Sequence, residues 1–146
     1  MAKVFNDEEQ QRIRAAIADA EKNTTGQVRV CIEKKCIEPV LDRAAKYFHL
    51  LDMHKTRLRN GVLIYVSTVD RKFAIIGDVG INKAAPVTFW DDTRNNMLQH
   101  IKYGNLVEGI VAGLEIVGNS LKKYFPQDVD DVNGETEDGL IFTTGD

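Results

Sequence analysis

Apolar and polar positions along the chain follow two different periods, and each period predicts one kind of element. Near the start, Asn6 and Glu9 form a capping-box pattern, in which each side chain can hydrogen-bond the backbone at the other position. Apolar residues then recur every three or four positions and predict an amphipathic helix over about residues 7–22. Residues 27–33 alternate instead, with β-branched side chains on one face and Arg, Cys and Glu on the other, and predict a strand.

A second helix and two further strands follow. Pro39 is suited to the first turn of a helix that runs to about residue 51. Residues 62–66 are apolar without interruption, as expected of a strand that helices cover on both faces. Because a helix separates this strand from the first, the two should run parallel with a right-handed crossover. Only a short turn precedes the next strand, over residues 72–77, so that pair should be antiparallel and the sheet mixed.

Two more helices complete the predicted fold. Thr88 and Asp91 repeat a capping signal and begin a third helix that ends near residue 104. A fourth helix, which a proline ends, carries Gly109 and Gly113 on one face, and we expect a neighbouring backbone to approach there. The fold class is therefore α/β: a three-layer α/β/α sandwich with a small mixed β-sheet of about three to four strands, flanked by helices.

The charge of the chain is divided unevenly. The 146 residues carry a net charge of −3, but the last twenty contain seven acidic residues and neither Lys nor Arg, which leaves +4 on the rest. We therefore divide the chain into one α/β/α domain, residues 1–126, and an acidic C-terminal tail, residues 127–146. The tail fails the ligand spacing of a calcium-binding EF-hand, although residues 140–142 could dock back on the body. A body so weakly basic does not predict nucleic-acid binding.

The sequence as given contains no signal for membrane insertion or export. Its first residues lack the apolar core of a signal peptide, and no apolar segment is long enough to span a membrane. We expect a cytoplasmic protein, while noting that the mature form of an exported protein would have the same features. We also expect a monomer.

The cysteines and histidines do not have the spacing of a metal or redox site. Cys31 and Cys36 are five positions apart, which fits neither a redox pair nor a zinc knuckle, so we expect two buried thiols. His49 and His54 are also five apart and should lie on different faces of a helix, while His100 lies on another helix. Surface or partly packed positions are predicted for all three histidines.

Strand direction divides the charged turns between the two ends of the sheet. Asp70 and Arg71 fall in the turn between the second and third strands, and Asp78 follows the third strand at the opposite end. Eight residues of extended chain separate the two carboxylates by roughly 26 Å, so they cannot share a ligand. The Asp70–Arg71 turn is first of all a solvated hairpin turn, and it is the second candidate site.

The Asp78 end is the candidate metal site. Asp78 lies between two glycines in what we expect to be a flexible loop, and Asp91 and Asp92 come into range if the third helix begins there. Carboxylate oxygens suit Ca²⁺ or Mg²⁺ more than Zn²⁺. The alternative is that Asp91 serves only as a helix cap. Arg57 and Arg59 could bring a phosphate to the same end.

These motifs together resemble the TPM domain family, which includes a thylakoid-lumen phosphatase-like protein of photosystem II repair and many bacterial proteins. The similar segments are residues 25–30 (TGQVRV), 60–66 (NGVLIYV), 70–72 (DRK), 77–81 (GDVGI), Trp90 and residues 124–126 (YFP). The resemblance covers almost the whole chain and implies an α/β/α sandwich, divalent-cation binding, usually of calcium, and acid phosphatase activity in some members. Asp78 is similar to one soluble branch of the family. The signal peptide and C-terminal spanning helix of its membrane-anchored members have no counterpart in this sequence.

Two functions from different classes follow. The first is a calcium-binding module that acts through an unknown protein partner, with Asp78, Asp91 and Asp92 as the cation ligands. The second is a metal-assisted acid phosphatase (a phosphomonoesterase), in which the cation polarises the phosphoryl oxygens and Arg57 or Arg59 stabilises developing charge. We favour the binding module, because the sequence shows no nucleophile paired with a base and therefore assigns no catalytic residue. A structural domain without a ligand is the third interpretation.

Overall fold

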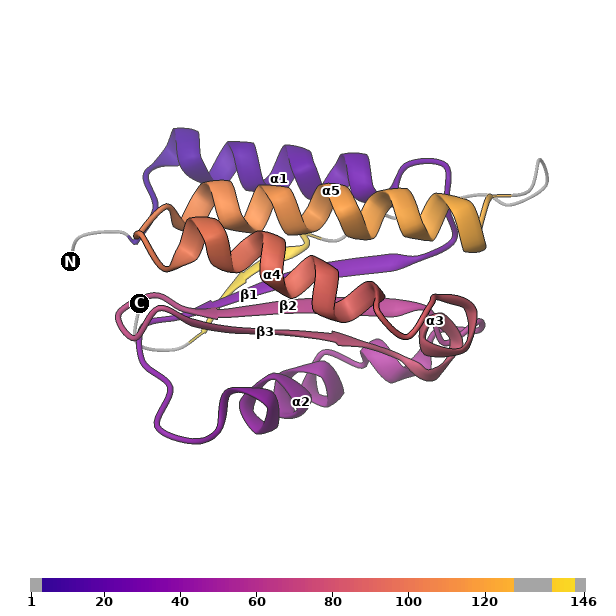
Figure 1. The fold of residues 1–146 in the computed structure, drawn as a ribbon, viewed down its shortest axis with the longest axis horizontal. Coiled ribbons are helices and arrows are strands. Elements are labelled where there is room, and N and C mark those ends of the chain that lie inside the picture. Colours follow the sequence, from indigo (N-terminus) through magenta and orange to yellow (C-terminus); the bar gives the residue numbers. More distant parts are fainter. Residues whose placement is uncertain (1–3, 128–137, 144–146) are drawn as a thin grey trace.

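The computed structural model describes residues 4–127 and 138–143, which form helices packed on both faces of a single sheet (Figure 1). In chain order the elements are α1 (Asp7–Glu21), β1 (Gln27–Glu33), α2 (Val40–Leu50), the 3₁₀ helix η1 (Met53–Lys55), β2 (Gly61–Ser67), β3 (Lys72–Gly77), α3 (Val79–Ala84), α4 (Phe89–Ile101), α5 (Leu106–Tyr124) and β4 (Leu140–Phe142). None of the helices in these two ranges is long and apolar enough to cross a membrane.

The sheet has the mixed topology that the connections predict. Its strand order is β3-β2-β1-β4, with β1 parallel to β2 and β2 antiparallel to β3. The fourth strand, β4, pairs in parallel with β1 at the edge, where Val30 lies opposite Leu140. Residues 140–142, for which the sequence suggested docking on the body, are therefore part of the sheet. The acidic run before it, residues 128–137, lies outside the described residues.

Three layers are evident in Figure 1: α1, α4 and α5 cover one face of the sheet, and α2 covers the other. Each face has its own apolar cluster, the larger one under α1, α4 and α5 and the smaller one under α2. Every residue of β2 is buried, as the uninterrupted apolar run predicts. The second face of β1 is buried as well: Glu33 is bonded to Arg43 and Tyr47 of α2, and Arg29 pairs with Glu21 of α1.

Two local predictions, the capping box of α1 and the glycine face of α5, are confirmed. Asn6 and Glu9 form the capping box: the side chain of Asn6 accepts from the backbone N–H of Glu9 at 2.7 Å, and that of Glu9 accepts from Asn6 at 2.9 Å. The glycine face of α5 packs against α4, since a Cβ atom at Gly109 would lie 3.2 Å from the backbone carbonyl oxygen of Met97. A third glycine of the same helix, Gly118, lets α1 approach in the same way.

Two other local predictions are wrong. The segment 77–80, expected to be a flexible loop, is the end of β3 and the start of the short helix α3, which sequence periodicity did not reveal. Thr88 precedes α4, but its side chain makes no capping hydrogen bond and its backbone is already helical. Cys31 and Cys36 are buried free thiols, as predicted.

Candidate functional site

An ion pair between the buried Asp78 and the exposed Arg59 lies at the end of the sheet where β3 stops. The guanidinium of Arg59 donates from Nε to Oδ2 of Asp78 at 2.7 Å and from Nη2 to Oδ1 at 2.9 Å. The same Oδ1 atom accepts from the backbone N–H of Val79 at 2.7 Å, so Asp78 also caps α3. The Asp78 side chain is only 5% exposed, whereas that of Arg59 is 46% exposed. The hydrogen bond from Arg59 to Asp78 raises the pKa of Arg59.

The backbone around Gly80 explains why this pair can form. Gly80 donates its N–H to the carbonyl oxygen of Arg59 at 2.8 Å. This bond places the first turn of α3 directly on the loop that carries Arg59. A Cβ atom at Gly80 would overlap the carbonyl oxygen of Leu58 and lie 2.5 Å from that of Arg59. Arg59 itself has a left-handed backbone, with φ of 53°. A residue without a side chain at position 80 therefore fixes the distance between the two charged partners.

The first turn of α4 is attached to the same end through Trp90 and Asn82. The indole Nε1 of Trp90 donates to Oδ1 of Asn82 at 2.7 Å, and the Asn82 amide donates to the carbonyl of Gly77 at 3.0 Å. Asp91 and Asp92 follow Trp90 in the first turn of α4. Both are exposed, however, and Asp91 forms an ion pair with Arg94.

Two loops from the parallel strands complete this end of the site. The buried side chain of Asn60 donates from Nδ2 to Oγ1 of Thr25 at 3.1 Å, which links the starts of β1 and β2. Arg57, in the same loop as Arg59, is exposed. Strand direction thus placed these loops together correctly. Of the two arginines predicted to bind phosphate, Arg59 is engaged by Asp78 and Arg57 faces solvent.

The predicted metal ligands are not gathered into a coordination shell. Within residues 4–127 and 138–143, no group of three or more His, Cys, Asp or Glu side chains is arranged to hold a metal ion. The carboxylate of Asp78 nevertheless has the chemistry that a hard divalent cation prefers, and it is buried against a positive counter-ion, the guanidinium of Arg59. Arg59 therefore supplies the positive charge that neutralises Asp78.

The second candidate site, Asp70 and Arg71, links loops at the opposite end. Oδ2 of Asp70 accepts from the backbone N–H of Cys36 at 2.7 Å and from the hydroxyl of Ser67 at 3.1 Å, which ties the β2–β3 turn to the β1–α2 loop. The Cys36 N–H is the main cause of the lowered pKa of Asp70. Arg71 has a left-handed backbone, and its guanidinium lies beside Gly104 in the α4–α5 loop.

Sequence reasoning missed a buried carboxylate at the end of β1. Glu33 accepts a bidentate pair of hydrogen bonds from Arg43, both at 2.9 Å, and further bonds from the hydroxyls of Tyr65 at 2.6 Å, Tyr47 at 2.9 Å and Thr143 at 3.0 Å. These bonds, that of Arg43 first, lower the pKa of Glu33 to about 2. The available signal was the spacing of Arg43 and Tyr47, four apart on the helix that covers this strand.

The histidines are closer together than their spacing predicted. The rings of His49 and His54 stack with centroids 4.0 Å apart and an interplanar angle of 8°. The prediction of different helix faces is wrong, because the two histidines do not share one helix. The helix α2 ends at Leu50, and Asp52, which has a left-handed φ of 57°, then turns the chain back before η1. His54 Nδ1 is buried and has no hydrogen-bond partner among the described residues. Two stacked imidazoles do not form a metal-binding group with a third ligand in this part of the chain.

Comparison with known proteins decides the family. The TPM domain family matches residues 1–120, which is most of the chain. The chain belongs to the TPM domain family. The resemblance seen in the sequence is therefore confirmed, and the α/β/α fold of this TPM domain agrees with it. No curated protein matches the sequence.

Solved structures with the same fold include one at substantial identity. The NMR structure of the BA42 protein from the psychrophilic bacterium Bizionia argentinensis is 44% identical to this TPM domain, with a TM-score of 0.88 over 98% of each chain. The N-terminal domain of the cg2496 protein from Corynebacterium glutamicum is 14% identical, with a TM-score of 0.66 over 92% of this chain and 84% of that one. An N-terminal domain from P. gingivalis is 16% identical, with a TM-score of 0.66 over 84% of this chain and 79% of its own. The last two are similar in fold alone.

Proposed function

We propose that this TPM domain is a divalent-cation-binding module that acts through a protein partner, and that the cation takes the place of Arg59 on Asp78. The observation that carries the proposal is the asymmetry of the ion pair: the carboxylate is buried, whereas almost half of the arginine side chain is exposed. A buried carboxylate needs a positive counter-ion. Because Arg59 can swing into solvent, a cation from solution can replace it without unfolding the site.

The ligand chemistry favours Ca²⁺, with Mg²⁺ as the alternative. Asp78 would provide the buried carboxylate, and Asp91 or Asp92, from the adjacent turn of α4, would add further oxygen atoms. Calcium accepts six to eight oxygen ligands in flexible arrangements, so exposed carboxylates and water can complete its shell. The cation would supply positive charge at a fixed place.

Release of Arg59 connects cation binding to a partner. Arg57 is already exposed two positions earlier in the same loop. Once Arg59 leaves Asp78, two guanidinium groups are available on one loop, and guanidinium groups bind carboxylates with two parallel hydrogen bonds. The cation therefore converts an internal ion pair into a surface that recognises an acidic segment of a partner.

Phosphomonoester hydrolysis is the second candidate function, since a cation beside Arg57 and a released Arg59 could also bind a phosphate. Hydrolysis further requires a positioned nucleophile or a base that activates water. If the activity belongs to this site, turnover of an aryl phosphate should disappear when Asp78→Asn and Asp91→Asn are combined. Turnover that persists unchanged in that double variant would belong to a contaminant.

Substitution of Arg59 gives the sharpest test of cation exchange. We expect Arg59→Gln to bind Ca²⁺ about tenfold more tightly than the original protein, because a competing charge-assisted pair is removed. Asp78→Asn should abolish saturable binding at this end. Isothermal titration calorimetry on metal-free protein measures both effects.

Matched variants separate this effect from a general change in charge. Arg71→Gln removes an arginine with the same left-handed φ of 53° at the opposite end, and Asp42→Asn removes an exposed carboxylate of α2. Both controls should leave the calcium affinity unchanged. Calcium affinity that survives Asp78→Asn, or that falls in Arg59→Gln, would overturn the proposed exchange.

A further inference from the structure

Three loops at the opposite end of the sheet form one surface. They are the β1–α2 loop (residues 34–39), the β2–β3 turn (residues 68–71) and the α4–α5 loop (residues 102–105). The backbone N–H of Val69 donates to the carbonyl of Lys34 at 2.8 Å, and Asp70 accepts from Cys36, so the first two loops are joined. The guanidinium of Arg71 lies against Gly104 and joins the third.

Each of these loops presents one apolar side chain to solvent. Ile37 is 99% exposed, Tyr103 is 72% exposed and Val69 is 60% exposed. Single exposed apolar residues are common on proteins, but a set contributed by three adjoining loops is a feature of binding surfaces. We refer to Ile37, Val69 and Tyr103 together as the apolar tip.

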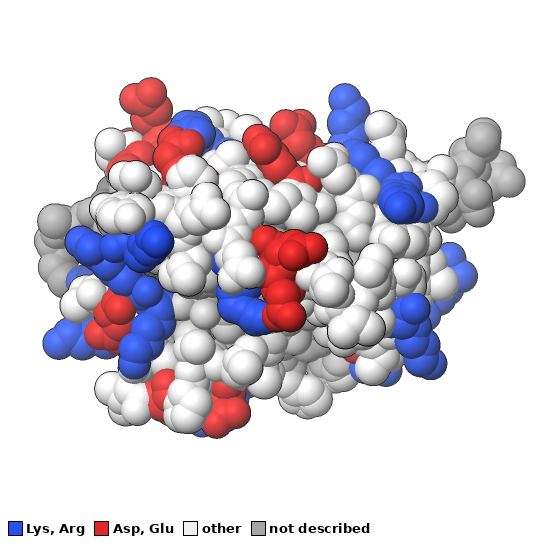
Figure 2. All heavy atoms as spheres, viewed as in Figure 1, with Lys and Arg blue, Asp and Glu red and all other residues white. Residues whose placement is uncertain are grey.

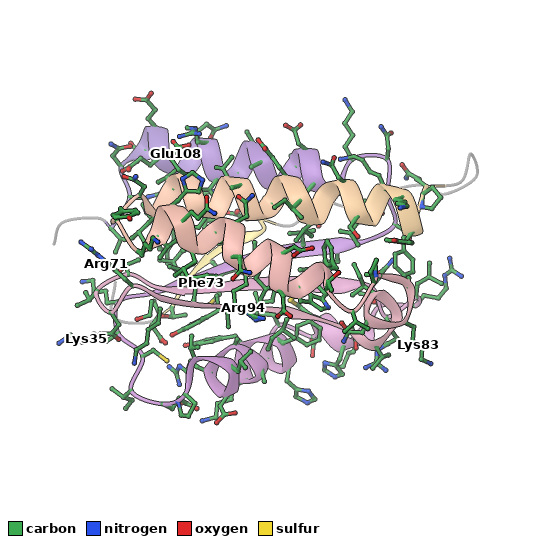
Figure 3. The ribbon with its side chains drawn as sticks, viewed as in Figure 1. Lys35, Arg71, Phe73, Lys83, Arg94 and Glu108 are labelled. Carbon is green, nitrogen blue, oxygen red and sulfur yellow. The ribbon has the colours of Figure 1, made fainter. Side chains whose placement is uncertain are left out.

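Basic side chains surround the apolar tip. Lys35, Arg71 and Lys102 come from the same three loops, one from each, and Lys72 follows the turn. Figure 2 shows Lys and Arg at this end of the molecule, with some Asp and Glu among them and further Lys and Arg at the far end, and Figure 3 places Lys35 and Arg71 here, with Lys83 at the far end.

The acidic side chains of this end are mostly engaged within the domain. Glu38 pairs with Arg43 and Lys46, and Asp70 accepts the two hydrogen bonds from Cys36 and Ser67 described above. Asp42, in the first turn of α2, and Glu8, in the first turn of α1, are exposed, and Glu108, in the first turn of α5, pairs with Arg12. Within the three loops themselves both acidic residues are engaged, so the charge that these loops present is predominantly positive.

We propose that the apolar tip and its basic surround dock on an anionic lipid surface. Aliphatic and aromatic side chains that protrude beside Lys and Arg can enter the headgroup region while the cations contact lipid phosphates. A peptide partner would be expected in a groove, and one groove among the described residues, about 360 Å³ between α1 and α5, lies on the helical face instead. The Asp78 end faces away from the lipid in this arrangement and stays open to the cation and partner.

Vesicle co-sedimentation tests the proposal with the whole chain. The protein should bind vesicles of equal parts phosphatidylglycerol and phosphatidylcholine at low salt, and should not bind pure phosphatidylcholine. The double variant Ile37→Ser with Val69→Ser should lower the partition coefficient roughly tenfold, through loss of two inserted side chains. Lys35→Gln and Lys102→Gln should each lower it about fivefold and reduce its dependence on salt.

The far end of the molecule supplies matched controls. Val87 is 94% exposed, and Lys83 lies nearby on α3, so Val87→Ser and Lys83→Gln remove the same kinds of side chain away from the tip. Both should leave vesicle binding unchanged. The proposal is overturned if anionic vesicles do not bind, or if the Val87 variant loses as much binding as the tip variant. It is also overturned if polyglutamate binds as tightly as vesicles do and Ile37→Ser has no effect, since the partner would then be an acidic polypeptide.

Discussion

Glu33→Gln is expected to lower the free energy of unfolding by about 3 kcal/mol at pH 7, because the pKa of Glu33 falls from 4.5 to about 2 on folding. The carboxylate is buried and accepts hydrogen bonds from Arg43, Tyr47 and Tyr65 at the same time. An amide cannot accept all of these bonds, and the guanidinium of Arg43 would lose its counter-ion. Urea denaturation at pH 7 measures the change. Glu108→Gln, which breaks an exposed pair with Arg12, is the control and should leave the free energy of unfolding almost unchanged.

The lowered pKa of Glu33 also predicts that the free energy of unfolding falls at acid pH. A carboxylate whose pKa is lowered by folding stabilises the native state fully above its unfolded pKa, and loses that contribution as the pH falls toward its folded pKa. For Glu33 the window lies between about pH 4.5 and pH 2. The slope of stability against pH should be shallower in Glu33→Gln across this window. An unchanged slope would show that Glu33 does not carry this part of the acid sensitivity.

Gly80→Ala is expected to destabilise the domain by about 3 kcal/mol. Its Cβ atom would meet two backbone carbonyl oxygens, those of Leu58 and Arg59, and neither can rotate away. Such a loss should lower the melting temperature by roughly 6–12 °C for a domain of this size. The substitution should also disturb the pairing of Arg59 with Asp78, since Gly80 sets their separation.

Gly26→Ala is the matched control for this prediction. Its Cβ atom would also come close to a neighbour, 2.7 Å from a methyl carbon of Leu121, but that neighbour is the end of a flexible side chain. Thermal denaturation followed by circular dichroism compares the two variants. If Gly80→Ala is as stable as Gly26→Ala, the close packing of α3 on the Arg59 backbone does not constrain the site.

Periodicity and connection lengths were sufficient to predict most of the fold. The capping box of α1, the parallel pair β1 and β2, the antiparallel β3 and the glycine face of α5 each follow from a local pattern or a short connection. The same rules placed the charged turns correctly at two ends of the sheet. The helix α3 escaped prediction because it has only six residues, which is too short to show a period, and its Asp78 cap was taken for a loop residue.

The partners of buried charges could not be predicted from the sequence. Arg59 and Asp78 are 19 residues apart, and Glu33 meets Thr143 across 110 residues, so only the tertiary fold shows these contacts. Asp78 was predicted as a ligand in a flexible loop, whereas the fold buries it against Arg59.

The most direct test of cation exchange at Asp78 is a ¹H–¹⁵N NMR titration of the metal-free protein with Ca²⁺, with Mg²⁺ for comparison. The account predicts saturable shifts of the backbone amides of Asp78 and Val79, of the Arg59 Nε–H and of the Trp90 indole N–H. These groups report on the ion pair and on the attached turn of α4. Shifts confined to the acidic run 128–138, or none at millimolar metal, would contradict a cation site at Asp78.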